Sequence, residues 1–403
     1  MKTIRKIKNL KNKKVLVRVD FNVPVRDDGI VDEKEDWRIR AALPMIEYLL
    51  EKEAKIILIS HLGRPDANRK FILDTTVDSR LHRNDNIAKY SLKPVADRLE
   101  GLLNREIKFI DDCIGDGAKR AVEEMRAGEI VLLENLRFYK EEKENNEEFA
   151  KELAGLADIY VNNAFSVSHR KHASVHAITK FLPSYAGLLL EKEVEILSKA
   201  INNPKKPATI IVGGAKMKTK VPVIEYLIDK FDHILVGGIV ANVILKAKGI
   251  DTGKSLIDGI DIKEVRKIDL ASNKLYVPVD AAVCNSQKKE VDLRAVGKIG
   301  DNKILDIGPE TGKLYSKIIR DSKTVIWNGP MGMFEKEDFA FGTREIAEAV
   351  VKSKGYTIIG GGDTIAALDQ FGCIGNVDYV CTGGGAMLEF LAGKKLPGLE
   401  ALE

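Results

Sequence analysis

The fold is decided by stretches such as Ile56–Arg64, IILISHLGR. Four apolar residues, typical of a strand that is buried on both faces, give way within one residue to polar and basic side chains. An amphipathic helix is expected before them at Arg38–Lys52, which is the pattern of a β-α-β unit in a parallel sheet. Ligands of such sheets bind at the C-terminal ends of the strands. The sequence therefore places His61 and Arg64 at a ligand-binding edge.

The same alternation of short apolar strands and longer amphipathic segments continues along the chain and predicts an α/β fold with mostly parallel sheets. A chain of 403 residues is too long for one ordinary core, so we expect two domains. We place their boundary near Gly187, before the helical pattern of Leu188–Leu197. The expected strands are Val15–Val19, Ile56–Ser60, Ile107–Ile110, Ile130–Leu133, Ile159–Val161, Thr209–Val212, His233–Val236, Thr324–Trp327, Thr357–Ile359 and Tyr379–Cys381.

The composition is that of a soluble globular protein, with 44% hydrophobic and 31% charged residues. The net charge of +4 does not favour nucleic acid as a partner, and the longest apolar run is too short to span a membrane. Four cysteines are scattered without a C-x-x-C pair, and the basic N-terminus lacks the apolar run of a signal peptide. A cytoplasmic location is expected.

Strands in the first half run into basic and polar side chains. They supply Arg18, Arg64 and Arg137, with Arg38 and Arg170 nearby and two histidines, His61 and His169. Guanidinium groups match phosphate and carboxylate oxygens in a bidentate fork, so the set is suited to a small polyanion. Surface ion pairing explains any one of these arginines equally well. Their occurrence together at strand ends favours a binding site.

Strands in the second half run into glycines instead, at Gly213–Gly214, Gly237–Gly238, Gly329, Gly360–Gly362 and Gly383–Gly385. A glycine turn before a helix exposes backbone N–H groups to phosphate, although glycines are also needed for tight turns alone. Lys216 and Lys220, four residues apart, form a cationic pair on one helix face or belong to an exposed lysine-rich face. Asp363 is either a Mg²⁺ ligand or a helix N-cap.

Taken together, these motifs resemble the phosphoglycerate kinase family, and the resemblance covers essentially the whole chain. The matching segments follow the family's order: Arg18–Pro24 (RVDFNVP), Arg38–Pro44, Ser60–Pro65, Leu133–Phe138, His169–Arg170, Gly213–Lys216, Asp306–Pro309, Trp327–Pro330, Gly360–Thr364 and Thr382–Ala386. The segment 66–89, after Pro65, is longer than is usual in the family and is expected to form a solvated surface loop.

The resemblance implies two Rossmann-like domains that face each other across a cleft and are joined by a hinge helix. These domains would be 1–186 and 187–392, with the tail 393–403 packing back on the first. The implied reaction is reversible phosphoryl transfer from 1,3-bisphosphoglycerate to ADP, giving 3-phosphoglycerate and ATP, with Mg²⁺ bound to the nucleotide and with domain closure. A monomer is expected.

The family's site residues carry over onto matching positions. Phosphoglycerate would be bound by Asp20, Asn22, Arg38, His61, Arg64, Arg137 and Arg170. The nucleotide would be bound by Gly213, Lys216, Lys220, Gly238, Asn328, Pro330, Glu335, Gly361, Gly362, Asp363 and Thr364, with Asp363 at the metal and Glu335 at the ribose. Arg38, Lys216, Lys220 and the backbone at Gly361 and Gly384 are expected to stabilise the phosphoryl group during transfer.

Two other classes of function are considered. A two-domain protein that closes on an anion without chemistry would need the arginines but not the glycine turns or the lysine pair. A dinucleotide-dependent dehydrogenase would need G-x-G-x-x-G after an early strand, with an acidic residue about 20 residues later, and the sequence lacks it. An assay of ATP formation distinguishes the three.

Overall fold

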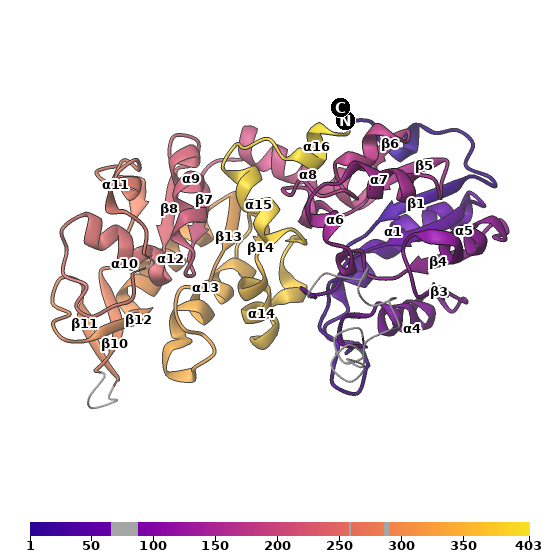
Figure 1. The fold of residues 1–403 in the computed structure, drawn as a ribbon. Coiled ribbons are helices and arrows are strands. Elements are labelled where there is room, and N and C mark those ends of the chain that lie inside the picture. Colours follow the sequence, from indigo (N-terminus) through magenta and orange to yellow (C-terminus); the bar gives the residue numbers. More distant parts are fainter. Residues whose placement is uncertain (66–87, 258, 286–290) are drawn as a thin grey trace. The chain divides into compact units, whose positions relative to one another are not determined.

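The computed structural model describes residues 1–65, 88–257, 259–285 and 291–403. It divides into two compact units, one formed by Met1–Val194 with Lys395–Glu403 and the other by Glu195–Lys394. We call the first part unit 1 and the second part unit 2 (Figure 1). The loop expected at 66–89 lies almost entirely outside the described residues.

Unit 1 is built on a parallel sheet with the strand order β3-β4-β2-β1-β5-β6. Its strands are β1 (Lys14–Arg18), β2 (Lys55–Ile59), β3 (Lys108–Ile110), β4 (Ile130–Leu133), β5 (Ile159–Asn162) and β6 (Ser184–Ala186). Its helices are α1 (Trp37–Glu51), α4 (Lys93–Leu103), α5 (Gly115–Glu123), α6 (Lys140–Lys143), α7 (Glu147–Ala154) and α16 (Pro397–Glu400), with short 3-10 turns η1 (Ile4–Lys6), η2 (Leu136–Phe138), η3 (Phe165–Val167) and η4 (Ala177–Lys180).

Alternate residues of these strands lie on opposite faces of the sheet and belong to two separate hydrophobic cores. Val15, Val17, Ile56 and Leu58 pack on one face with residues of α1 and α4. Leu16, Ile57 and Ile59 pack on the other with residues of α5 and α7. Because helices cover both faces, the strands read as continuous apolar runs. All five strands expected in the first half are present, and the short β6 is an addition.

Unit 2 repeats the architecture with a second parallel sheet in the order β15-β14-β13-β7-β8-β9. Its strands are β7 (Ala208–Val212), β8 (His233–Val236), β9 (Leu275–Tyr276), β13 (Thr324–Asn328), β14 (Tyr356–Gly360) and β15 (Tyr379–Cys381). Its helices are α9 (Met217–Leu227), α10 (Gly238–Ala247), α11 (Ile262–Val265), α12 (Pro309–Asp321), α13 (Phe341–Val351), α14 (Gly362–Gln370) and α15 (Gly384–Leu391), with η5 (Glu337–Phe339) and η6 (Ile374–Asn376).

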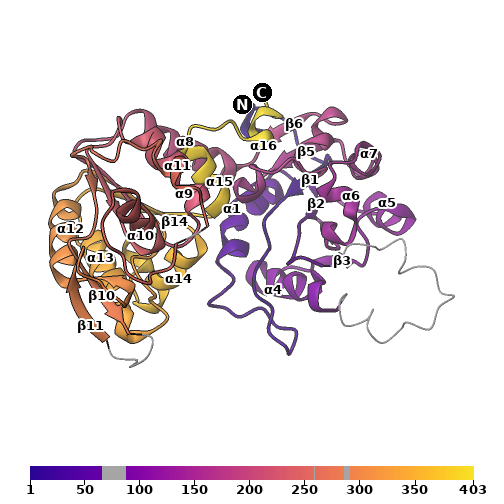
Figure 2. The same cartoon turned by 60° about the vertical axis from the view of Figure 1, so that its left-hand side comes forward.

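A small antiparallel sheet in unit 2 was not expected from the sequence. It pairs β10 (Asp280–Cys284) with β11 (Val291–Ala295) on one side and β12 (Lys303–Ile307) on the other. Figures 1 and 2 both show β10 and β11 beside α10. The side chains of β11 are exposed throughout, so the strand lacks the apolar run by which the other strands were recognised.

The ends of the chain meet in unit 1. The amide of Lys2 donates to the carbonyl oxygen of Leu402 at 3.3 Å, and Gly398 packs against Ser168 and Val175. The helix α8 (Leu188–Asn202) contains the division between the units, which falls after Val194. None of the helices in the described part of the chain has the length and apolar character that a membrane crossing requires.

Candidate functional site

The basic side chains of unit 1 gather at the C-terminal ends of β1, β2, β4 and β5. Arg38, at the start of α1, donates to Asp20 Oδ2 at 2.5 Å, and its guanidinium also lies 4.9 Å from the ring centre of Trp37. Ser166 donates to the same carboxylate oxygen. Asp20 is buried and follows β1, so it anchors Arg38 while leaving that side chain 22% exposed. The guanidinium is thus oriented and still accessible to an anion.

A second set of contacts joins the strand ends through the backbone. The side chain of Asn22 accepts from the amide of Gly63 at 2.7 Å, and Arg137 donates to the carbonyl oxygen of Gly63 at 2.6 Å. Gly63 has a φ of +59°, which an L side chain rarely adopts. This conformation lets one glycine contact two predicted site residues.

Arg137 is the most constrained cation of the set. It is buried, and its Nε and second terminal nitrogen have no hydrogen-bond partner within the described residues. Burial, together with the positive charges of Arg170 and Arg18, lowers its pKa to about 10. Unpaired buried donors are costly, so an oxyanion that accepted from them would bind favourably.

Two histidines beside these arginines are uncharged at neutral pH. Burial lowers the pKa of His61 well below its usual value, and the charges of Arg18, Arg137, Arg170 and Arg38 lower it further. Burial and Arg170 lower the pKa of His169 to about 4. Positive charge in this site therefore comes from guanidinium groups.

Arg64 and Arg170 complete the predicted set. Arg64 is exposed after β2, and the pKa of Arg170 is lowered by burial first and by the charge of Arg64 next. All seven predicted phosphoglycerate residues thus belong to one basic cluster in unit 1. Ser166, in η3, was not identified from the sequence, because a single serine carries no recognisable signal.

In unit 2 the glycine turns pack against one another. A Cβ on Gly213 would lie 2.1 Å from the carbonyl oxygen of Pro330, and one on Gly329 would lie 2.2 Å from that of Gly213. The amide of Gly214 donates to Pro330 at 2.8 Å, and that of Gly238 donates to Met331 at 2.7 Å. These glycines are required for close backbone approach, whatever ligand they also contact.

Other glycines are open to their surroundings. No atom would lie within 4 Å of a Cβ on Gly362, and one on Gly384 would have Gly361 Cα as its nearest neighbour at 3.4 Å. Gly361 and Gly383 directly precede α14 and α15, so the N-termini of these two helices lie next to each other. The first backbone N–H groups of each helix have no partner within the helix, so the two N-termini together can bind an anion.

The lysine pair is split between two environments. Lys216 precedes the first turn of α9 and is exposed, whereas Lys220 is 5% exposed and donates to the carbonyl oxygen of Asn328 at 3.3 Å and to its side-chain oxygen. Burial lowers the pKa of Lys220 to about 7, although Asp363 opposes the shift. Thr364 accepts from the amide of Gly329 at 2.7 Å, so its hydroxyl supports the glycine turn.

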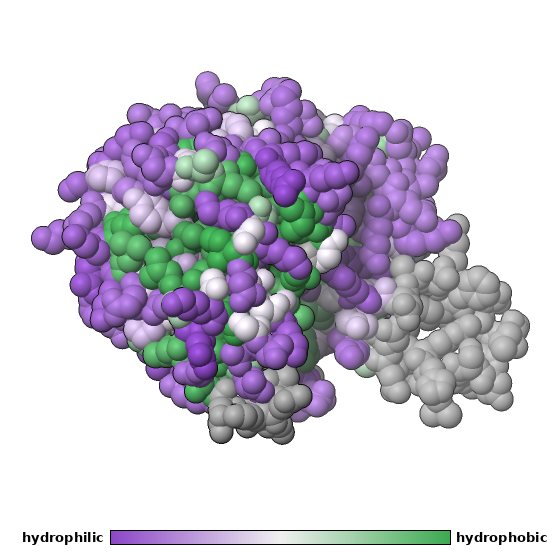
Figure 3. All heavy atoms as spheres, turned by 90° about the vertical axis from the view of Figure 1, so that its left-hand side faces the viewer, coloured by the Kyte–Doolittle hydropathy of each residue, from purple (hydrophilic) through white to green (hydrophobic). Residues whose placement is uncertain are grey.

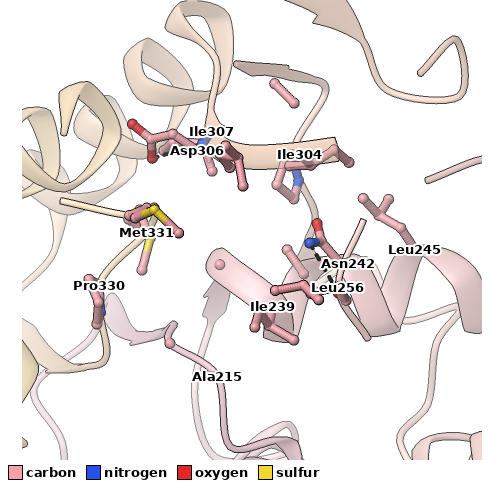
Figure 4. A pocket seen from close by; sticks show the side chains of 18 of the residues that line it. Ala215, Ile239, Asn242, Leu245, Leu256, Ile304, Asp306, Ile307, Pro330 and Met331 are labelled. Atoms are coloured by element: carbon pink, nitrogen blue, oxygen red, sulfur yellow. Dashed lines mark hydrogen bonds between the residues drawn. The ribbon is translucent and has the colours of Figure 1, made fainter. Parts of the chain in front are cut away.

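An apolar cavity of about 210 Å³ lies between α10 and the small antiparallel sheet (Figure 4). Ile239, Leu245, Leu256, Ile304 and Met331 line it. Figure 3 shows apolar side chains gathered on one face of unit 2, and Leu256, Val279, Val291 and Leu293 are exposed. The sequence did not predict this cavity, because its walls come from segments far apart in the chain.

Only some of the predicted nucleotide residues line this cavity. Gly238, Pro330, Glu335 and Asp363 line it. The others (Gly213, Lys216, Lys220, Asn328, Gly361, Gly362 and Thr364) are not among the described residues of its wall, nor is Gly384, which was predicted to act on the phosphoryl group in transfer. Asp306, which does line it, is buried and accepts from the amide of Gly342 at 2.6 Å, and burial raises its pKa to about 7.

Comparisons with known proteins agree along the whole chain. The family model described as phosphoglycerate kinase matches residues 4–394. A phosphoglycerate kinase of Moorella thermoacetica is 45% identical over 400 residues, covering 98% of this chain and 97% of that protein. One of Finegoldia magna is 44% identical over 411 residues, covering 100% and 99%.

Solved structures give the same result. The phosphoglycerate kinase structure from Coxiella burnetii matches with a TM-score of 0.82 at 38% identity, covering 99% of this chain and 98% of that one. The structure from Pyrococcus horikoshii matches with a TM-score of 0.83 at 33% identity, covering 100% and 98%. The expected α/β fold with two parallel sheets is confirmed.

Proposed function

The chain belongs to the phosphoglycerate kinase family, and we propose that its two units each bind one of the substrates of that family's reaction. The reaction is the reversible transfer of a phosphoryl group from 1,3-bisphosphoglycerate to ADP, giving 3-phosphoglycerate and ATP. The observation that carries the division is the contrast between strand ends: buried and half-buried guanidinium groups in unit 1, glycine turns and helix N-termini in unit 2.

Unit 1 is the proposed phosphoglycerate site. Arg137 and Arg170 bind the phosphate at the non-reacting end, with His61, Asn22 and Arg64 around it. Arg38, held by Asp20, faces the reacting carboxyl group. The unpartnered donors of Arg137 and the accessible guanidinium of Arg38 support this arrangement.

Unit 2 is the proposed nucleotide site. The apolar cavity takes the adenine ring, Glu335 on its wall binds the ribose, and the phosphates run toward the N-termini of α14 and α15. Lys220 and Lys216 contact the phosphates. In the free enzyme burial lowers the pKa of Lys220 to about 7, so much of it is uncharged near neutral pH, and a bound polyanion would favour its protonated form.

The metal is proposed to arrive with the nucleotide. Among the described residues, no group of three or more His, Cys, Asp or Glu side chains is arranged to hold a metal ion. The exposed carboxylate of Asp363, in the first turn of α14 and on the cavity wall, suits a Mg²⁺ that keeps most of its ligands from phosphate and water. When bound, Mg²⁺ neutralises phosphate charge.

Catalysis in this proposal consists of positioning and charge neutralisation. Arg38, Lys216 and the backbone N–H groups at Gly361 and Gly384 stabilise the phosphoryl group in transit. The acyl carboxylate is a good leaving group, so no general base is needed. Because the contributing residues belong to different units, we propose that the domains 1–186 with 393–403 and 187–392 close around α8 during each turnover. We propose that the protein acts as a monomer, since one chain supplies every residue used. We also propose a cytoplasmic location.

The test is ATP formation from 1,3-bisphosphoglycerate, ADP and Mg²⁺, followed by a coupled assay. The expected result is turnover that requires both substrates and saturates with each. Folded protein that binds ADP but forms no ATP would refute the catalytic proposal and favour a binding protein. Calorimetric titration of each substrate alone shows whether each binds without the other.

A further inference from the structure

A buried chain of polar side chains lies behind the basic cluster of unit 1, and the mechanism above uses only its last member, His61. It runs from Glu142 on α6 through Ser174 to Arg18 at the end of β1, and from there to His61. All four residues are buried, and Glu142, Ser174 and Arg18 are fully so. No pattern in the sequence pointed to Glu142, one of several glutamates in a charged stretch.

Arg18 donates in both directions along the chain, to Ser174 on one side and to His61 on the other, and Ser174 donates onward to Glu142. Ser174 donates its hydroxyl to Glu142 Oε1 at 2.7 Å and its amide to Oε2 at 2.9 Å. The same hydroxyl accepts from Arg18 Nε at 3.0 Å. Tyr160 donates to the carbonyl oxygen of Ser174 at 2.6 Å. Ser174 therefore connects a buried anion to a buried cation and is itself held from both sides.

The last contact determines the state of the imidazole. A terminal nitrogen of Arg18 lies 3.0 Å from His61 Nδ1. Arginine can only donate, so Nδ1 must accept and cannot carry a proton. The ring is consequently neutral with its proton on Nε2, and an imidazolium would have to break the contact.

We propose that Glu142 is a positioning residue for the phosphoglycerate site: through Ser174 it holds Arg18 against Nδ1 of His61, so that His61 presents an Nε2–H donor to the substrate. This inference rests on the proposed role of His61 as a substrate contact. His61 then acts as an oriented donor, while the guanidinium groups supply the charge.

The electrostatics of the chain agree with this assignment. Burial acts to raise the pKa of Glu142, but its contact with His172, the charge of Arg18 and the hydrogen bonds from Ser174 outweigh it, and the pKa is lowered. Glu142 is therefore an anion that compensates a fully buried arginine. The charged groups that face His61 are Arg18 from β1, Asp20 from the following loop at 4.0 Å, Arg38 from α1, Arg137 from η2 and Arg170 from the loop after η3.

The test combines kinetics with nitrogen NMR of the histidine rings. In Glu142→Gln, Arg18 loses its compensating anion and its hold on His61. We expect the KM for 3-phosphoglycerate to rise about tenfold, with the KM for ATP and kcat nearly unchanged. The matched control is Glu144→Gln, which changes an exposed carboxylate two residues away and should leave all three constants unchanged.

A readout independent of activity uses ¹⁵N-histidine, with the His61 signals identified by their loss in His61→Gln. The wild type should show the neutral Nε2–H tautomer from pH 6 to 8. In Glu142→Gln the ring should stay neutral, because burial and the surrounding arginines still lower its pKa, but without the fixed contact from Arg18 a share of the Nδ1–H tautomer should appear.

Folding is controlled with two further variants. Ser174→Ala keeps both charges and should give a smaller change in the same direction. Glu142→Gln/Arg18→Met removes both buried charges, avoids an unpaired arginine, and should keep the raised KM. An unchanged His61 tautomer and KM in folded Glu142→Gln would overturn the inference, as would an equal effect of Glu144→Gln. If His61→Gln itself leaves the KM unchanged, the proposed substrate site is wrong instead.

Discussion

The two units present different groups at the C-terminal edges of their parallel sheets, where we propose that each binds an anion. Unit 1 presents side chains: a buried carboxylate orients Arg38, and two nitrogens of the buried Arg137 have no hydrogen-bond partner among the described residues. Unit 2 uses backbone: glycine turns bring segments into contact and leave helix N-termini open. Side chains supply full charges at fixed points, whereas backbone amides supply partial charges over a longer surface. This contrast is the reason for proposing that the compact metabolite binds unit 1 and the extended nucleotide binds unit 2.

The largest expected effect comes from removing the oriented charge of unit 1. Arg38→Ala should lower kcat by about 10³- to 10⁵-fold, the range for a cation that stabilises a phosphoryl group in transit. ADP affinity, measured by calorimetry, should hardly change, because the proposed nucleotide site is in unit 2. Arg40→Ala, which removes an exposed guanidinium from the same helix, is the control. Turnover near the wild-type value in Arg38→Ala would remove Arg38 from the mechanism.

The next largest effect is expected in unit 2, where the close packing of the glycine turns, and not side-chain chemistry, would shape the proposed nucleotide site. Gly213→Ala would place a Cβ 2.1 Å from a carbonyl oxygen, a clash that costs about 1–3 kcal/mol. We expect ADP affinity to fall about 10- to 100-fold while 3-phosphoglycerate affinity stays the same, both by calorimetry. Gly375→Ala, where a Cβ meets no atom within 4 Å, is the control. If both variants bind ADP normally, the turn tolerates side chains and the comparison fails.

Lys220 is an exception to this contrast, because it is a buried side-chain cation in unit 2, where backbone groups predominate. Its pKa is about 7 when free, and bound phosphates should raise it. ADP binding should then take up close to one proton above pH 7. The affinity for ADP should increase by at most about tenfold per pH unit as the pH falls from 10 to 7, and it should become constant below pH 7. Calorimetry in buffers of different ionisation enthalpy measures the uptake. Lys220→Met should abolish it and Lys218→Met, at an exposed position, should not.

The smallest effect concerns a side chain in the unit that relies on backbone. Glu335 is exposed on the cavity wall, and loss of one hydrogen bond to ribose costs about 1 kcal/mol. Glu335→Ala should therefore raise the KM for ADP about fivefold with kcat unchanged. Lys336→Ala, the exposed neighbour, serves as the reference. A change in kcat would place Glu335 nearer to the reacting phosphate than proposed.

Much of the fold was predictable because its signals are local. Runs such as Ile56–Ile59 are buried on both faces and change abruptly at the strand end, so the expected strands of both parallel sheets are present in the structure. The antiparallel sheet was not expected: its strand β11 is exposed and contains no apolar run, and the buried run of β10 is only three residues long. The cavity was missed for a related reason, since its walls combine α10, β12 and the loop after β13.

The sequence by itself determined which chemical groups stand at each strand end: arginines after β1, β2 and β4, glycines after β7, β8 and β13. These are properties of adjacent residues. Only the tertiary structure decided the state of those groups: that His61 is neutral, that Lys220 titrates near 7, and that Glu142 compensates Arg18. Charge state depends on burial and on neighbours within a few ångströms, and folding brings those neighbours from positions as much as 156 residues apart.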